Sequence, residues 1–173
     1  VLEDYHNDPF SVSSDELNMC IAISECIKEN TGLSLFKHFI PEETFCDTHY
    51  GYGGTCDLHT NRMEYAWVID YKSKDEVTAK TKGYDSHADQ LAAYANGFGM
   101  RHAKQANLFI SRTPPPEGEP WAVKFYEHKN TEIAWARFKH TLMTWQIIKK
   151  YGPYYSRYIE NLIPPELQHR SNT

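Results

Sequence analysis

A short apolar run that ends in an acid and a base constrains this chain most. Residues 65–69 are rich in aromatic and β-branched side chains, as buried strands are, and they lead directly into Asp70-Tyr71-Lys72. Alternate residues of a strand share a face, so we expect Asp70 and Lys72 to point one way and Tyr71 the other. The run therefore predicts a core strand that brings a carboxylate and an ammonium group together at its polar end.

A second carboxylate precedes this strand. Residues 54–58 predict an antiparallel partner strand, so Asp57 can lie beside Asp70 although the two are 13 positions apart. Hard cations such as Mg²⁺ prefer oxygen ligands and take few carboxylates from a protein. Asp57 and Asp70, with the main-chain carbonyl of Tyr71, meet that requirement, and Lys72 can orient a water and counter developing negative charge. Each residue alone also fits a simpler interpretation, as an exposed ion pair or a turn residue.

The next helix carries further polar residues at helical spacing. It is predicted to begin near residues 84–87 and to end near 96–97. Gln90 and Tyr94 are four positions apart and share a face, which His87 joins, and this face is expected to look towards the acids. His87 equally fits a surface position at the helix start. Three apolar residues of the helix are predicted to pack on the sheet: Leu91, Ala92 and Ala95.

These motifs resemble a known family. Asp57 followed by Asp70-Tyr71-Lys72 resembles the core of the PD-(D/E)xK nucleases, and Gln90-x-x-x-Tyr94 on the following helix is similar to the RecB-like branch. That branch includes phage recombination exonucleases and mitochondrial genome-maintenance exonucleases. The resemblance covers residues 43–97 at the level of motifs. An Asp-x-Lys triplet alone occurs by chance in many chains, whereas the three motifs in this order and at these gaps are more specific.

The resemblance implies a fold and an activity. The fold is α/β, a central mixed β-sheet flanked by helices in the restriction-endonuclease-like order α-β-β-β-α-β-β-α. The activity is that of a Mg²⁺- or Mn²⁺-dependent DNA exonuclease, which hydrolyses phosphodiester bonds in DNA recombination, repair or replication. Two alternatives stay open: a structure- or sequence-specific endonuclease of the same superfamily, and a catalytically silent nucleic-acid-binding subunit. The implied partner is DNA with free ends, and a homo-oligomer is possible.

The resemblance also assigns roles to residues. The implied catalytic residues are Asp57, Asp70, Lys72, Gln90 and Tyr94, and the implied substrate contacts are Lys74, His87, Gln90 and Tyr94. The metal would be held by Asp57, Asp70 and the carbonyl of Tyr71. In the family an upstream helix often adds an acid or a histidine near the metal; Glu25 is our choice, with Glu16 and His38 as rivals, and Glu43 is another possible site residue.

The rest of the chain fits one domain at residues 13–163, after an N-terminal arm at 1–12 and before a C-terminal tail at 164–173. Its first helix is expected to begin near Ser13 and to end at Gly32, which suits a C-cap. Strands are predicted at 41–50, 54–58, 65–69, 106–112 and 121–127, with a turn at 59–62 and a long helix from residue 130. An aromatic stripe on that helix predicts core or subunit contacts. Three tyrosines near the C-terminus have two interpretations, base stacking and helix packing: Tyr154, Tyr155 and Tyr158.

Composition and charge add weaker constraints. The net charge is −5, so any DNA contact would depend on the metal site and on local Lys and Arg residues. The four cysteines show no Cys-x-x-Cys pair, so we expect buried thiols. Some RecB-like nucleases carry an iron–sulfur cluster on cysteines that follow the core helix; none follows Cys56 here, so the resemblance implies no cluster. No apolar run approaches the roughly 18 residues of a membrane span. We expect an intracellular protein, and the small, stand-alone core favours a phage, viral or bacterial source.

Overall fold

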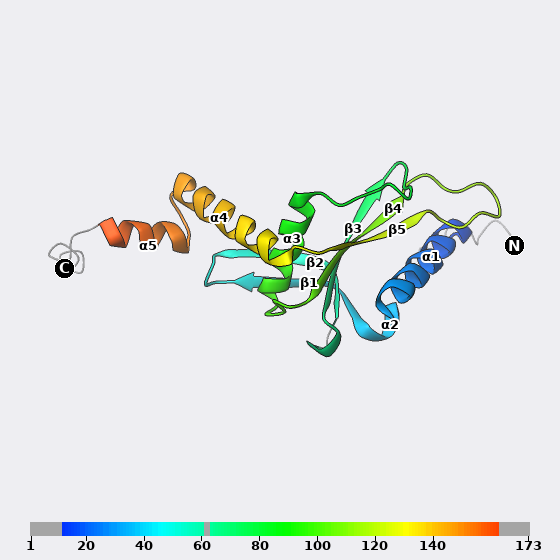
Figure 1. Cartoon of the computed structure of the whole chain (residues 1–173), viewed down its shortest axis with the longest axis horizontal. Helices are drawn as coiled ribbons and strands as arrows, with labels where there is room; N and C mark the ends of the chain where they lie inside the picture. Colours follow the sequence, from blue (N-terminus) through cyan, green and yellow to red (C-terminus); the bar gives the residue numbers. More distant parts are fainter. Residues whose placement is uncertain (1–11, 61–62, 163–173) are drawn as a thin grey trace, which may run out of the picture.

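The computed structural model describes residues 12–60 and 63–162. Its centre is a five-stranded sheet in the order β1-β2-β3-β4-β5 (Figure 1). The strands are β1 (Phe39–Asp47), β2 (Tyr52–Thr60), β3 (Trp67–Lys74), β4 (Lys104–Ser111) and β5 (Val123–His128). The helices are α1 (Ser14–Thr31), α2 (Leu35–His38), η2 (Met63–Tyr65), α3 (Asp85–Gly97), α4 (Thr131–Lys149) and α5 (Pro153–Leu162). The predicted tail and nearly all of the predicted arm lie outside the described residues.

The sheet is mixed, as predicted. β1 pairs with β2, β2 with β3, and β4 with β5 in antiparallel fashion, whereas β3 and β4 are parallel. Parallel neighbours need a crossover connection, and α3 lies in the segment that links β3 to β4. The predicted α/β architecture is therefore confirmed, with α2, η2 and α5 as elements that the sequence analysis did not include.

Helices cover both faces of the sheet. Ile27 of α1 packs with Leu58, Ile69 and Leu108 in one buried cluster. On the other face, Leu91 and Ala95 of α3 pack with Cys56, Val68, Met100 and Ala103. Because Val68 and Ile69 are adjacent in β3, the two clusters lie on opposite sides of that strand. The packing of Leu91 and Ala95 is as predicted.

Ala92 differs from that prediction. It clusters with Ala88 and with Ala134 of α4, so this part of α3 packs on another helix and not on the sheet. Small side chains at such a contact let two helices approach closely, which accounts for the alanines. Helix α3 thus packs on the sheet with one side and on α4 with another.

The first helix has the predicted ends. Ser13 and Glu16 form a reciprocal capping box, and Gly32 closes the helix in the left-handed conformation with φ 75°. Both devices satisfy backbone groups that a helix end leaves without partners. These local signals were sufficient to place α1 correctly.

The predicted turn at residues 59–62 is wrong for its first half. His59 and Thr60 are buried members of β2. The ring of His59 stacks on Phe98, and the Thr60 hydroxyl accepts a hydrogen bond from Trp67 N at 3.0 Å. These tertiary contacts extend the strand beyond the predicted Leu58. The strand predicted at residues 65–69 begins too early, because Tyr65 is exposed and belongs to η2.

The cysteines depart from the expectation of buried thiols. Cys56 is buried and Cys26 is half-buried, but Cys20 and Cys46 are exposed. Burial raises the pKa of Cys56 to about 12, so this thiol stays protonated at neutral pH.

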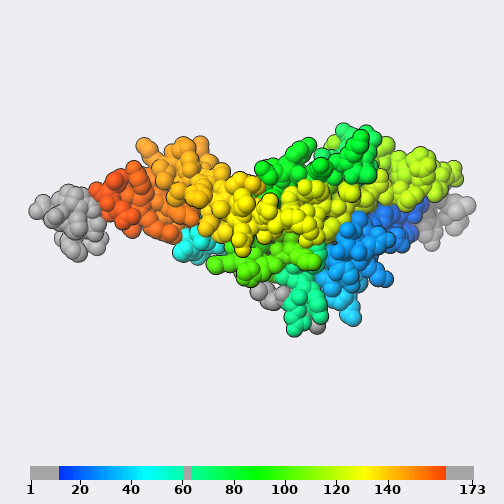
Figure 2. All heavy atoms as spheres, in the orientation of Figure 1, coloured from blue at the N-terminus to red at the C-terminus, as the bar shows by residue number. Residues whose placement is uncertain are grey.

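The long helix α4 runs across the face seen in Figure 2. Its C-terminal half and α5 pack at the turn of the β1–β2 hairpin, where Gln146 Nε2 donates to the carbonyl oxygen of Tyr50 at 2.8 Å and the ring of Tyr154 contacts that of Tyr50 (Figure 1). Trp135 and Phe138 stack on each other and contact Tyr52. Ile133, Trp145 and Ile148 are exposed, so only the middle of the predicted stripe packs within the described chain, and the alternative of a subunit contact stays a prediction for the exposed residues. Among the described residues, no helix is long and apolar enough to cross a membrane.

Candidate active site

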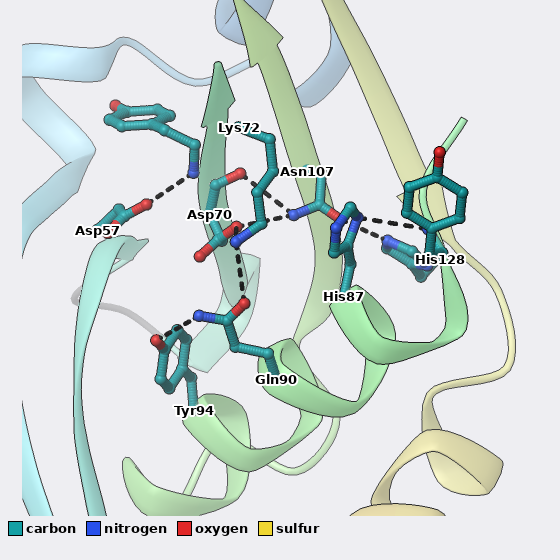
Figure 3. Close-up of polar contacts among 10 residues, drawn as sticks. Asp57, Asp70, Lys72, His87, Gln90, Tyr94, Asn107 and His128 are labelled. Carbon is teal, nitrogen blue, oxygen red and sulfur yellow. Dashed lines mark hydrogen bonds and ion pairs between the residues drawn. The ribbon is translucent and has the colours of Figure 1, made fainter. Parts of the chain in front are cut away.

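The candidate site lies where β2 and β3 separate. Among the described residues these strands pair at Leu58–Ile69 and His59–Val68, and the next position in this register would set Asp57 opposite Asp70. There the ladder stops, and Asp57 Oδ2 accepts a hydrogen bond from the backbone N–H of Tyr71 at 2.7 Å. The carboxylate thus takes the place of a strand partner and is held in the opening between the two strands (Figure 3).

Asp70 is buried in the same opening, with 3% of its surface exposed. Its Oδ2 accepts from Lys72 Nζ at 2.7 Å and from Asn107 Nδ2 at 2.9 Å. Burial raises the pKa of Asp70, the contacts with Lys72 and Asn107 oppose that effect, and the nearby charge of Asp57 adds to it. The negative charges of the two carboxylates therefore repel each other, as they do in sites where two acids bind one cation.

Lys72 links the acids to α3. Its ammonium donates to Gln90 Oε1 at 3.0 Å, and Gln90 Nε2 donates to the hydroxyl of Tyr94 at 2.7 Å. This chain fixes which end of the Gln90 amide faces the strand. Five residues named from the sequence thus lie together: Asp57, Asp70, Lys72, Gln90 and Tyr94 (Figure 3).

Two residues of this network were not predicted from the sequence. Asn107 of β4 is fully buried beside Asp70, and its Oδ1 lies 2.7 Å from His128 Nε2 on β5. Because Asn107 Nδ2 donates to Asp70, Oδ1 must be the acceptor, so His128 Nε2 carries a proton. The available signal was an asparagine inside an apolar strand, since a buried amide needs partners.

His87 and Lys74 border the site near the start of α3. His87 Nδ1 accepts from the backbone N–H of Tyr84 at 3.3 Å. Burial, followed by the charges of Lys72 and Lys74, lowers the pKa of His87 and favours its neutral ring. Lys74 Nζ lies 5.1 Å from the ring centroids of both Tyr84 and Phe109. Both predicted substrate contacts therefore lie on the same side of the sheet as Lys72.

The structure does not bring the upstream acid Glu25 to this site. Ile27 faces the sheet cluster that contains Ile69, which lies on the opposite side of β3 from Asp70, and Glu25 is exposed two positions away on α1. The orientation of α1 on the sheet, which the sequence pattern did not fix, removes Glu25 from the metal set. Its rivals are engaged elsewhere: Glu16 bonds Ser13, and His38 Nδ1 contacts the backbone of Ser34.

Glu43, the other possible site residue, also has a different partner. Its Oε2 lies 2.7 Å from Nε2 of the buried His59. His59 Nδ1 in turn lies 3.0 Å from the carbonyl oxygen of Thr60, so both ring nitrogens face acceptors. Glu43 therefore stabilises the end of β2.

The residues present suit a hard divalent cation. Within residues 12–60 and 63–162, no three His, Cys, Asp or Glu side chains converge into a complete metal cage. Two carboxylates and the carbonyl of Tyr71 form an oxygen-only set of the kind that Mg²⁺ uses when it retains several waters. The hydrogen bonds of Asp57 and Asp70 in the described structure are made through Oδ2, which leaves Oδ1 of each for a ligand.

Comparisons with known proteins add little. No family model and no curated protein matches the chain. A crystal structure named SSO0001 is similar to it, with 17% sequence identity and a TM-score of 0.39 over 87% of this chain and 67% of that one. A likeness at this level carries no argument about function.

Proposed function

We propose that this protein is a Mg²⁺- or Mn²⁺-dependent deoxyribonuclease that removes nucleotides from DNA ends. The observation that carries the proposal is the continuous polar chain from Asp70 through Lys72 and Gln90 to Tyr94, with Asp57 beside it. A simple ion pair at a strand end would need neither the second acid nor the glutamine. The resemblance to the PD-(D/E)xK nucleases supports the same class of reaction.

The acids have a common task. Asp57 and Asp70, with the carbonyl of Tyr71, would hold the cation, which when bound polarises a phosphoryl oxygen and makes a water more acidic. The hydrogen bond from Tyr71 N keeps Asp57 turned towards β3, and Asn107 keeps Asp70 in place. Their charge is then positioned before a substrate arrives, so little reorganisation is needed during the reaction.

Lys72 and α3 act on the substrate side. The ammonium is confined between Asp70 and Gln90, so it can orient a water and offset negative charge that develops on the phosphate. Gln90 and Tyr94 extend this polar surface along α3 and would contact the DNA backbone or the water. The preference for DNA ends rests on the resemblance of Gln90-x-x-x-Tyr94 to the RecB-like branch. The proposed role in DNA recombination, repair or replication would be carried out inside a cell.

The direct test is nucleotide release from linear and closed circular DNA in the presence of Mg²⁺, Mn²⁺ or EDTA. Metal-dependent loss of linear DNA alone is expected, together with a fall in turnover of about 10²-fold or more in Lys72→Ala. Lys80→Ala, which removes an exposed lysine from the loop after β3, is the matched control and should behave as wild type.

Other outcomes change the assignment. Cleavage of the closed circles would make the protein an endonuclease. DNA binding without hydrolysis under any of these metals would leave a binding subunit with the same fold.

A further inference from the structure

A second feature adjoins the candidate site: a groove of about 430 Å³. Its walls come from α3, α4 and the β1–β2 hairpin, and it shares Gln90 and Tyr94 with the polar chain described above. The volume lies within the roughly 300–1,000 Å³ typical of small-molecule sites. Most of the lining is apolar or aromatic: Phe45, Tyr52, Ala93, Tyr94, Phe138 and Leu142.

The aromatic walls of this groove are held in place. Tyr52 meets Phe138 edge to face at a centroid distance of 5.0 Å, and Phe45 meets Tyr52 in the same manner at 5.6 Å. The hydroxyl of Tyr52 donates to the carbonyl oxygen of Ala93 at 2.9 Å. The rings are half-buried, so part of their surface remains available to a ligand.

One end of the groove is polar, and the acidic residue at its edge is paired with an arginine. Gln90 lies at the junction, where its amide connects Lys72 with the hydroxyl of Tyr94. Asp89 is the acidic residue of the lining, and its Oδ1 pairs with Arg137 Nη2 at 2.7 Å. An anionic ligand would therefore meet a neutralised carboxylate at the rim and an ammonium beyond Gln90.

We propose that this groove receives an unpaired nucleobase from the DNA strand whose phosphate lies at Asp57, Asp70 and Lys72. The inference rests on the proposed function and names its substrate as DNA with an unpaired terminal nucleotide. Stacking on aromatic side chains suits every base, so such a groove needs no sequence preference. An internal paired base keeps both faces covered within the duplex, and a terminal paired base stays bonded to its partner strand. An unpaired or extruded base is therefore the one free to enter the groove beside Phe138 and Tyr52.

The test compares two end-labelled single strands that are identical except at the terminal nucleotide, which is normal in one and abasic in the other. Binding is measured by fluorescence anisotropy with Ca²⁺ in place of Mg²⁺, so that hydrolysis does not interfere. Wild type is expected to bind the base-bearing strand about tenfold more tightly, as loss of one stacked base implies.

Substitutions on α4 locate the effect. Thr141 is exposed and lines the groove, so Thr141→Trp should fill it and bring the affinity ratio of the two strands close to one. Thr141→Ala leaves the groove open and should keep the ratio. Thr144 is exposed on the same helix but does not line the groove; with Trp145 and Ile148 it lines a neighbouring surface that Thr141 also borders. Thr144→Trp is therefore the matched control for a bulky side chain on that surface and should also keep the ratio.

Each outcome decides the matter. Equal binding of the two strands by wild type, or a ratio that survives Thr141→Trp, overturns the assignment of the groove. If Mg²⁺-dependent hydrolysis persists in that case, the proposed function stands without it. Absence of both DNA binding and hydrolysis overturns the proposed function and this inference together.

Discussion

Around Asp70 the two faces of β3 and β4 differ in chemistry, although the face towards α3 also carries the apolar side chains of Val68 and Phe109. On the face towards α1, Ile69 and Tyr71 meet Ala106 and Leu108 in an apolar cluster. On the face towards α3, Asp70 and Lys72 meet Asn107, and every bond in the group links polar atoms. One face stabilises the fold by removing apolar surface from water, whereas the other retains buried polar groups that cost free energy unless each is satisfied. Substitutions on the two faces should therefore affect different measurements.

Asp70→Asn should produce the largest effect. It keeps the size of the side chain but removes a proposed metal ligand's charge, so turnover in Mg²⁺ should fall by about 10³-fold or more while the thermal midpoint changes little. Nucleotide release and circular dichroism would measure the two. Asp75→Asn is the control, because that acid is exposed and pairs with Arg112. Unchanged turnover in Asp70→Asn would remove the metal assignment.

Ile69→Ala tests the opposite face. Ile69 is fully buried, so truncation should lower the free energy of unfolding by about 2–5 kcal/mol, while turnover per folded molecule stays near wild type. Chemical denaturation gives the first quantity and nucleotide release the second. Ile133→Ala removes the same atoms from a side chain that is 57% exposed and should change stability by less than about 0.5 kcal/mol. A catalytic loss without destabilisation would break the division between the faces.

Asn107→Ala should affect both measurements moderately. It leaves the buried Asp70 and the half-buried His128 each without one partner, at a cost of about 1–3 kcal/mol in stability. Residues that orient a metal ligand typically contribute about 10–100-fold to activity, and a loss of that size is expected here. Asn30→Ala serves as control, since Asn30 is exposed and its amide bonds Cys26 O and Sγ within the same helix. An effect on stability alone would make Asn107 a structural residue.

The smallest effect concerns pH. Burial, and next the charge of His87, lowers the pKa of His128 from its ordinary 6.5. The folded protein thus binds this proton less readily than the unfolded chain, so His128 makes stability fall as pH drops through that value and below. His128→Gln keeps a donor for Asn107 but cannot titrate. The thermal midpoint of this variant should therefore rise relative to that of wild type as the pH falls from about 7.5 to 5.5. A constant difference between the two midpoints over this range would contradict the prediction.

Local patterns predicted much of this arrangement. Strand alternation placed Asp70 and Lys72 on one face, where they lie 2.7 Å apart, and helical spacing joined Gln90 to Tyr94. Both are relations within one element, which short-range geometry determines. Asn107 and His128 were missed because their contacts depend on which strands become neighbours. Glu25 was misplaced for a similar reason, since its direction depends on how α1 turns its apolar side onto the sheet.

The separation of β2 from β3 gives the sheet a seam. β1 and β2 form one group of paired strands, and β3, β4 and β5 form another. Among the described residues, the two groups pair with each other at Leu58–Ile69 and His59–Val68. Asp57 belongs to the first group and Asp70 to the second. A ligand bound by both acids would therefore cross-link the two groups of strands. Any bending of one group relative to the other would change the distance between the carboxylates of Asp57 and Asp70. The same opening that makes room for chemistry thus makes the geometry of the acids sensitive to the mechanics of the whole sheet.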